Sequence, residues 1–248
     1  MAEVWIGTSG WSYKHWEKTF YPEKMPPAEN LAHFSQHFRT VEINYSYYQL
    51  PPRETFELWR RKSPKGFLFA VKASRYLTHM RKLKEPREPL QRLLNNASGL
   101  GEKFGPVLFQ FPRRWAINLP RLREFFEALA GHPPHRYAFE FRHQSWLVGE
   151  VYDCLREHNA ALCLPIGWGI PLEVQLTADW TYIRFHAGER SHFFEDDELE
   201  PWARRIRAWR EQGVSSFSYF NNDTLWHGRP AAIDNARRLI DMVGPPRA

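Results

Sequence analysis

Eight short apolar runs of strand type, separated by longer amphipathic stretches, constrain the fold of this chain more than any other feature. The runs are Val4–Gly7, Thr40–Tyr45, Phe67–Ala73, Val107–Phe111, Tyr137–Arg142, Ala160–Pro165, Tyr182–His186 and Ser216–Asn221. Helical periodicity follows in Glu29–Phe38, Arg53–Lys62, Pro89–Leu100, Leu119–Ala130, Trp146–His158, Leu199–Gln212 and Ala231–Val243. Only residues 167–179 lack this periodicity, which predicts a short or irregular crossover there.

The alternation of strands and helices predicts parallel βαβ units. Eight such units without an obvious linker predict one α/β domain over residues 1–248, a TIM-type (β/α)8 barrel, with a flexible tail from about residue 244. An open doubly wound sheet is the alternative fold. The first strand is not followed by Gly-x-Gly-x-x-Gly, which weakens a dinucleotide-binding version of that alternative.

The composition is that of a globular protein without membrane segments. Hydrophobic residues make up 43% of the 248 residues, and no apolar run approaches the roughly 18 residues that a membrane helix needs. The chain starts almost directly with a strand and shows no signal-peptide pattern. Its two cysteines, Cys154 and Cys163, are too few for a disulfide framework or a cysteine zinc site. We therefore expect a cytoplasmic protein with both thiols buried.

The net charge of +6 is compatible with an anionic ligand or a nucleic acid but requires neither. One basic cluster consists of Arg204, Arg205, Arg207 and Arg210, and it alternates with apolar residues at helical spacing. This pattern is more typical of a solvated helix face than of a binding patch.

A buried charge pair is predicted within the strand Arg136–Arg142. One face of this strand is aromatic, whereas the other carries Ala138, Glu140 and Arg142. Burying a charge costs several kcal/mol unless it is paired. Such a pair on the small-residue face of an aromatic strand often marks a functional site.

Period-two alternation extends this prediction to the other strands. Their non-aromatic faces become polar toward the carboxyl end, with Glu42, Asn44, Lys72, Gln110, Arg184, His186 and Asn221, followed by Asn222 and Asp223. In a barrel these side chains point inward at the C-terminal face, where barrel enzymes place catalysis. The alternative interpretation is a structural network in which the two glutamates neutralise the cations.

Several motifs distributed along the whole chain carry a family resemblance. They are Ile6–Tyr13 (IGTSGWSY), Phe20–Pro22, Val41–Tyr48 (VEINYSYY), Phe69–Ser74, Leu108–Pro112, Glu140–Trp146 (EFRHQSW), Tyr182–Gly188 and Tyr219–Asp223. Together they resemble the DUF72 (YecE-like) family. This resemblance implies a TIM barrel, but the family's biochemical role is not established. The likeness of its barrel to the endonuclease IV and xylose isomerase group suggests a nucleic-acid or phosphate role by fold analogy alone. The family often has another residue at the position of Asp223, so a catalytic role for Asp223 does not follow.

The first functional hypothesis is a hydrolase- or lyase-like enzyme that acts on a phosphorylated or otherwise anionic small molecule or nucleic-acid component. Positive charge would come from Lys72, Arg142 and Arg184, and acid–base catalysis from Glu42, Glu140 or His186. Lys72 is also a candidate for covalent catalysis through a Schiff base. The remaining predicted substrate contacts are Asn44, Gln110, Asn221, Asn222, Trp11, Tyr47 and Trp146. No cofactor is predicted for this reaction.

Two alternatives stay open. A divalent metal held by Glu42, Glu140, His186 and Asp223 would support phosphodiester hydrolysis, although the sequence lacks metal-binding spacings and three cations lie nearby. A non-catalytic module would bind nucleic acid or a protein through aromatic side chains beyond the strand ends. These aromatic residues are Trp11, Tyr13, Trp16, Tyr47, Tyr48, Trp146 and Trp168. They could equally pack the loops at the barrel mouth.

Overall fold

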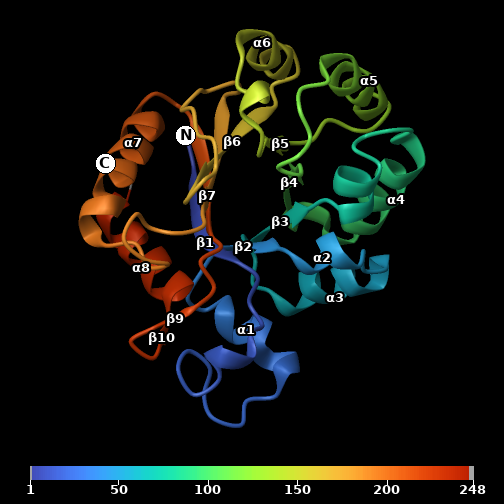
Figure 1. Ribbon diagram of the computed structural model, residues 1–248. Helices are drawn as coiled ribbons and strands as arrows, with labels where there is room; N and C mark the ends of the chain where they lie inside the picture. The colour runs from blue at the N-terminus through green and yellow to red at the C-terminus, as the bar shows by residue number, and fades with distance from the viewer. Residues whose placement is uncertain (1, 246–248) are drawn as a thin grey trace.

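The computed structural model describes residues 2–245, and within them eight parallel strands close into a barrel in chain order (Figure 1). The strands are β1 (Val4–Ser9), β2 (Thr40–Ile43), β3 (Leu68–Lys72), β4 (Phe104–Gln110), β5 (Tyr137–Glu140), β6 (Ala161–Ile166), β7 (Trp180–Phe185) and β8 (Ser215–Phe220). Pairing between β1 and β8 completes the closure. The predicted (β/α)8 barrel and all eight predicted strands are confirmed.

Helices surround the barrel, as Figure 1 shows. They are α1 (Asn30–Phe34), α2 (Tyr45–Tyr48), α3 (Arg53–Lys62), α4 (Arg87–Ala97), α5 (Leu119–Leu129), α6 (Gly149–Glu157), α7 (Asp196–Glu211) and α8 (Ala231–Val243). Shorter 3₁₀ turns are η1 (Lys14–Trp16), η2 (Pro27–Glu29), η4 (Ser98–Lys103) and η5 (Gln144–Trp146), and η3 (Tyr76–Met80) is a π-helical turn. The two-residue strands β9 (Leu225–Trp226) and β10 (Arg229–Pro230) form a hairpin after β8.

The seven predicted helical stretches all contain a helix, but five of these helices begin or end at residues other than those predicted. The helix predicted over Glu29–Phe38 ends at Phe34, and the chain continues in turns to Phe38, whose N–H bonds to the Phe34 carbonyl. The helix predicted over Trp146–His158 begins at Gly149 because Gln144–Trp146 forms a separate 3₁₀ turn. No helix occurs between β6 and β7, as the absence of helical periodicity in residues 167–179 predicted.

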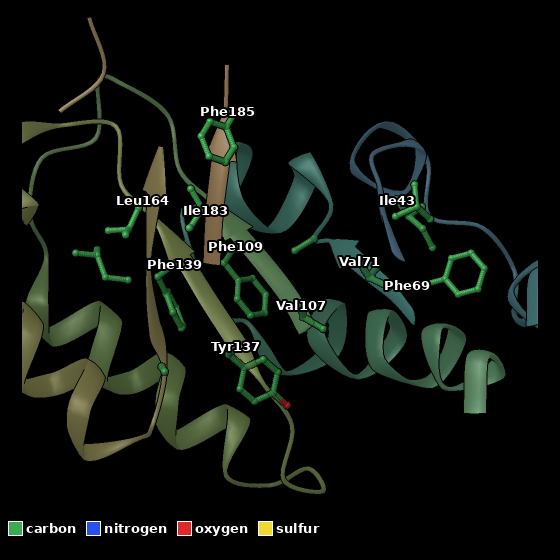
Figure 2. Packing of buried hydrophobic residues seen from close by; sticks show 14 of the residues in the cluster. Ile43, Phe69, Val71, Val107, Phe109, Tyr137, Phe139, Leu164, Ile183 and Phe185 are labelled. Carbon is green, nitrogen blue, oxygen red and sulfur yellow. The ribbon is translucent and has the colours of Figure 1, made fainter. Parts of the chain in front are cut away.

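Side-chain alternation sorts the strands into two apolar clusters. The outward cluster packs against the helices and contains Val41, Ile43, Phe69, Val71, Val107, Phe109, Tyr137, Phe139, Ile183 and Phe185. Figure 2 labels these residues except Val41, with Phe109 and Phe139 on neighbouring strands. The ring centroids of Phe109 and Phe139 lie 5.4 Å apart. The inward cluster is smaller and contains Trp5, Ala70, Leu108, Ala138, Ala161, Cys163, Trp180, Tyr182, Phe217 and Tyr219. The period-two prediction of the two faces is therefore confirmed.

Small side chains leave room inside the barrel for long polar ones. Ala70 and Ala138 lie two residues before Lys72 and Glu140 on the same inward faces, and both alanines are fully buried. Gly7 is required on β1 because a Cβ atom there would lie 2.2 Å from the Thr40 carbonyl oxygen. The polar side chains therefore gather at the carboxyl ends of the strands, above an apolar lower layer.

Three further expectations concern the remainder of the chain. Both cysteines are free and buried, as predicted. Within residues 2–245, no helix has the length and apolarity needed to cross a membrane. The predicted flexible tail falls largely on residues 246–248, which lie outside the described residues.

Candidate functional site

Arg184 lies at the centre of a buried ion network inside the barrel. Its Nη1 donates to Oε2 of Glu140 and its Nη2 donates to Oε1 of Glu42, each at 2.8 Å. The side chains of all three residues are at most 1% exposed. β7 thus supplies one guanidinium that joins the carboxylates of β2 and β5 across the barrel, which the sequence alone could not specify.

The two glutamates have no free carboxylate oxygen. Glu42 also accepts from the hydroxyls of Ser9 at 2.6 Å and Tyr182 at 2.7 Å. The second oxygen of Glu140 accepts from Nε of Arg142. Burial alone would raise the pKa of Glu140, but the charges of Arg142 and Arg184 outweigh it and hold that pKa well below its usual range. This geometry favours a positioning role for both carboxylates over the predicted acid–base role.

A chain of hydrogen bonds leads from Glu140 toward the barrel mouth. Nη2 of Arg142 donates to Nε2 of His186 at 3.0 Å, and Nδ1 of His186 lies 3.0 Å from the amide of Asn221. Burial and then Arg184 lower the pKa of His186 well below its usual value, so its imidazole is neutral near pH 7. Because a guanidinium only donates, Nε2 of His186 accepts from Arg142. Asn44 extends the chain through its amide, 3.1 Å from Asn221.

Lys72 ends β3 on the same inward face, but it differs from the other charged groups. Its side chain is buried, and within the described residues it has neither a hydrogen bond nor an ion pair. Its Nζ lies 4.2 Å from the centroid of the Tyr47 ring. Burial, followed by the charge of Arg184, lowers the pKa of Lys72 to about 8. Since the two glutamates balance Arg142 and Arg184, the charge of Lys72 has no counter-ion in this network.

The loop after β3 adds a histidine beside Lys72. His79 lies in the π-helical turn η3, and its ring centroid is 5.2 Å from that of Tyr47. Burial and then Lys72 lower the pKa of His79 to about 4. The Thr78 hydroxyl donates to the Ser74 carbonyl, so it must accept from Nδ1 of His79 at 3.0 Å. The free Nε2 of His79 is therefore an acceptor.

Backbone strain follows directly after this turn. Lys82, Leu83 and Glu85 have φ angles of 48°, 64° and 48°, in the left-handed region that non-glycine residues rarely adopt. π-Helical turns and strained backbone both concentrate at functional sites. The π-helical turn carries His79, which packs against the Tyr47 ring that also contacts Lys72.

Of the three aromatic residues predicted to contact a substrate, the structure places two, Trp11 and Trp146, outside the site. Trp146 is fully buried, stacks on Phe141 and donates its indole N–H to the Trp115 carbonyl at 2.7 Å. Trp11 packs edge-to-face on Trp59 at 5.1 Å and also contacts Phe69, so it lies against the outer face of β3. These two side chains pack the loops because their large apolar surfaces gain more from burial than from exposure at the mouth. Of the predicted aromatic contacts, Tyr47 joins the site.

The structure brings some of the remaining predicted substrate contacts to the site and places others elsewhere. Gln110 is partly exposed and donates to the Phe111 carbonyl at 2.8 Å. Asn222 is buried away from the ion network, where its amide bonds to Asn235 at 2.9 Å and to the His192 carbonyl at 2.8 Å. Asn222 follows Asn221 directly, and successive residues of an extended chain point to opposite sides. The structure therefore brings Asn221 but not Asn222 to the site.

The predicted metal ligands do not meet in one group. Asp223 binds His15 at 2.9 Å and the Trp16 indole at 3.0 Å, and not the glutamates. Among the described residues, the one group of three potential metal ligands with atoms close together is Cys154, Glu157 and His158 at the end of α6. Arginines and hydroxyls already occupy the oxygens of Glu42 and Glu140, so this arrangement does not favour the metal-assisted alternative.

The basic cluster on α7 is used within the fold. Arg207 and Arg210 donate to carbonyls at the C-terminal end of α8, with Nη1 of Arg210 3.0 Å from the Gly244 oxygen. Arg205 lies over the Trp202 ring. The sequence favoured a solvated helix face over a binding patch. Arg207 and Arg210 instead bind carbonyls at the end of α8, so neither interpretation holds for these two residues.

Sequence reasoning missed several residues of the site. Ser9, Tyr182 and Cys163 contact the buried glutamates, and His79 approaches Lys72 through Tyr47. The alternation along β1, β6 and β7 could have placed the first three inside the barrel. No sequence signal marks His79, because its position depends on the π-helical turn.

The fold and the site define a TIM-type barrel with a buried arginine–glutamate network at the C-terminal end. A model of the family described as "Protein of unknown function DUF72" matches residues 5–248, and the chain belongs to this family.

The UPF0759 protein YunF of Bacillus subtilis is 24% identical over 280 residues, covering 97% of this chain and 94% of that protein. The crystal structure of a DUF72 family protein from Thermotoga maritima is 28% identical, with a TM-score of 0.78, and the match covers 95% of this chain and 97% of the other. A DUF72 structure from Enterococcus faecalis shares the fold at 16% identity, with a TM-score of 0.80 over 99% and 97% of the two chains.

Proposed function

We propose that this chain is an enzyme that acts on a small phosphorylated or otherwise anionic molecule at the C-terminal end of its barrel. The observation that carries the proposal is the uncompensated cation Lys72, buried without an ion pair beside an otherwise balanced network. A buried cation without a partner is costly. An anionic substrate would supply the missing counter-ion at this position.

The accessible groups around Lys72 suit anion recognition. Nε and Nη2 of Arg142 bond to Glu140 and His186, and its side chain is 11% exposed, so the guanidinium keeps further N–H groups for a ligand. The glutamates are buried and occupied by arginines, so they would not repel an incoming phosphate strongly. The amides of Asn44 and Asn221 add neutral hydrogen-bonding groups at the same end of the barrel.

The reaction would be of hydrolase or lyase type and would depend on proton transfer. Lys72, with a pKa of about 8, can gain or lose a proton near neutral pH. The neutral imidazole of His186 lies against Arg142 and Asn221, and His79 offers an acceptor at Nε2. We assign the glutamates to holding Arg142 and Arg184 in place.

Binding of inorganic phosphate and of phosphorylated sugars, measured by calorimetry, tests this proposal. We expect Lys72→Met to weaken binding at least about tenfold, because it removes the unpaired charge. The matched control is Lys65→Met, since Lys65 is exposed and lies outside the network. Unchanged affinity in Lys72→Met, or equal losses in both variants, would overturn the anion site.

The enzymatic part needs its own readout. Phosphorus NMR of a panel of phosphorylated small molecules should show conversion of at least one compound by the wild type and by Lys65→Met. The same compound should persist unchanged with Lys72→Met. Equal conversion by all three proteins would remove Lys72 from the reaction, and conversion by none would argue against an enzyme for these substrates.

A further inference from the structure

The chain contains two buried lysines whose amines differ in their hydrogen-bond partners. Nζ of Lys103 donates to the carbonyls of Arg60 and Ser63, each at 2.6 Å, and to the Ser63 hydroxyl at 3.0 Å. These contacts satisfy all three donors of an ammonium. Lys72 has none of them, although it is similarly buried at 8% exposure against 5% for Lys103. The amine of Lys103 is therefore held by three acceptors, whereas that of Lys72 has no hydrogen-bond acceptor among residues 2–245.

The surroundings of Lys72 increase the fraction of neutral amine near pH 7. Burial and Arg184 lower its pKa to about 8, against the 10.5 of an ordinary lysine. Roughly a tenth of the amine is then unprotonated at pH 7, several hundred times the fraction in a solvated lysine. Only the unprotonated amine has a lone pair for nucleophilic attack.

The amine also lies beside two aromatic rings. Nζ of Lys72 is 4.2 Å from the centroid of the Tyr47 ring, and the imidazole of His79 packs edge-to-face against Tyr47, with the two centroids 5.2 Å apart. The acceptor Nε2 of His79 is free to receive a proton or to hold a water molecule. Both residues lie at the open end of the barrel, where a substrate would enter.

We propose that Lys72 is a covalent nucleophile that forms an imine with an aldehyde or ketone carrying a phosphate or carboxylate group. The proposal rests on the proposed function and specifies its substrate class. The anionic group would lie against Arg142, and the carbonyl carbon would face Nζ of Lys72.

The step is balanced without any further reagent. The lone pair of Lys72 attacks the carbonyl carbon, so a C–N bond forms while the C–O π bond breaks. A proton passes from nitrogen to that oxygen and gives a carbinolamine. A proton from solvent then converts the hydroxyl to water, which leaves as the C=N bond forms, and the resulting iminium returns its N–H proton to solvent to give the imine. Hydrolysis of the imine reverses these steps and restores the amine.

Reductive trapping tests the proposal on the intact protein. The probes are glyoxylate and glycolaldehyde phosphate, which are anionic, with acetaldehyde as the uncharged match, and cyanoborohydride reduces any imine to a stable secondary amine. Peptide mass spectrometry then measures labelling at each lysine. We expect Lys72 to react at least about tenfold faster than Lys103 and Lys65. Its rate should rise with pH and level off above about pH 8.

Two variants and one competitor separate the outcomes. Lys72→Met should lose the fast label, Lys65→Met should keep it, and inorganic phosphate should slow it. Labelling of Lys72 no faster than that of Lys65 overturns the imine proposal, and phosphate binding that depends on Lys72 would leave the proposed function standing. Fast labelling that phosphate does not slow, with equal rates for acetaldehyde, would instead support the nucleophile and contradict the anion site.

Discussion

At the scale of single residues, Glu140 illustrates how one carboxylate can control several cations. It binds Arg184 at 2.8 Å and also Arg142, whose guanidinium in turn orients His186. All of these groups are buried or nearly so. The position of the accessible groups therefore depends on a residue that the substrate would not reach.

Replacing Glu140 tests this positioning role. We expect Glu140→Gln to lower the free energy of unfolding by roughly 3–5 kcal/mol, since it leaves two arginines without a full counter-charge. Urea denaturation measures the loss. The control is Glu57→Gln, which breaks the exposed Arg53–Glu57 pair at 3.0 Å and should cost about 0.5 kcal/mol or less. Equal losses in the two variants would show that the buried network contributes little.

At the scale of elements, α7 and α8 are joined by arginines that the sequence presents as a basic patch. Arg210 donates to the carbonyls of Gly244 and Val243, which the end of α8 leaves without helical partners. Arg207 likewise donates to the Met242 carbonyl. These cations also lie at the negative end of the α8 dipole, where they stabilise the helix.

Arg210→Ala should therefore lower the unfolding free energy by about 1 kcal/mol. The control on the same helix is Arg204→Ala, because Arg204 is largely exposed and its contact with Glu200 is long, at 3.8 Å. We expect that variant to change stability by no more than about 0.5 kcal/mol. Thermal unfolding of both proteins gives the comparison, and the opposite ranking would contradict the capping role.

At the scale of the whole molecule, the barrel interior makes stability depend on pH through Lys72. The pKa of this lysine is about 8 in the folded chain and close to 10.5 when unfolded. The unfolded chain therefore binds more protons between these values, and stability from this group rises with pH across that window. Below pH 8 both states are protonated, and the folded chain carries the full cost of the buried charge.

Because this contribution to stability rises with pH, the unfolding free energies of the wild type and Lys72→Met should depend differently on pH. From pH 7.5 to 9.5 the wild type should gain on the order of 2 kcal/mol relative to Lys72→Met. Subtracting the variant removes the contributions of the tyrosines and other groups that titrate at high pH. Parallel pH profiles of the two proteins would show that Lys72 is an ordinary, fully charged lysine.

Particular residues show how far local pattern predicts the fold and the site. Alternation along each strand correctly separated Phe139 from Glu140 and Ile183 from Arg184, because a strand has only two faces and one of them must be apolar. The prediction also included Asn222, although it follows Asn221 directly and the same alternation directs its side chain to the opposite side, where it bonds to Asn235. For Trp146 and Trp11, composition could not distinguish a substrate contact from loop packing.

The sequence by itself determined the barrel, its eight strands, the face of each strand and the end at which polar residues gather. These properties depend on neighbours a few residues apart, whose spacing the sequence states directly. Only the tertiary structure decided that Arg184 joins Glu42 to Glu140, that Lys72 forms no ion pair with any of residues 2–245, and that His79 approaches it. Those contacts join residues from different strands and loops, and closure of the barrel selects one pairing among several that the charges alone would allow.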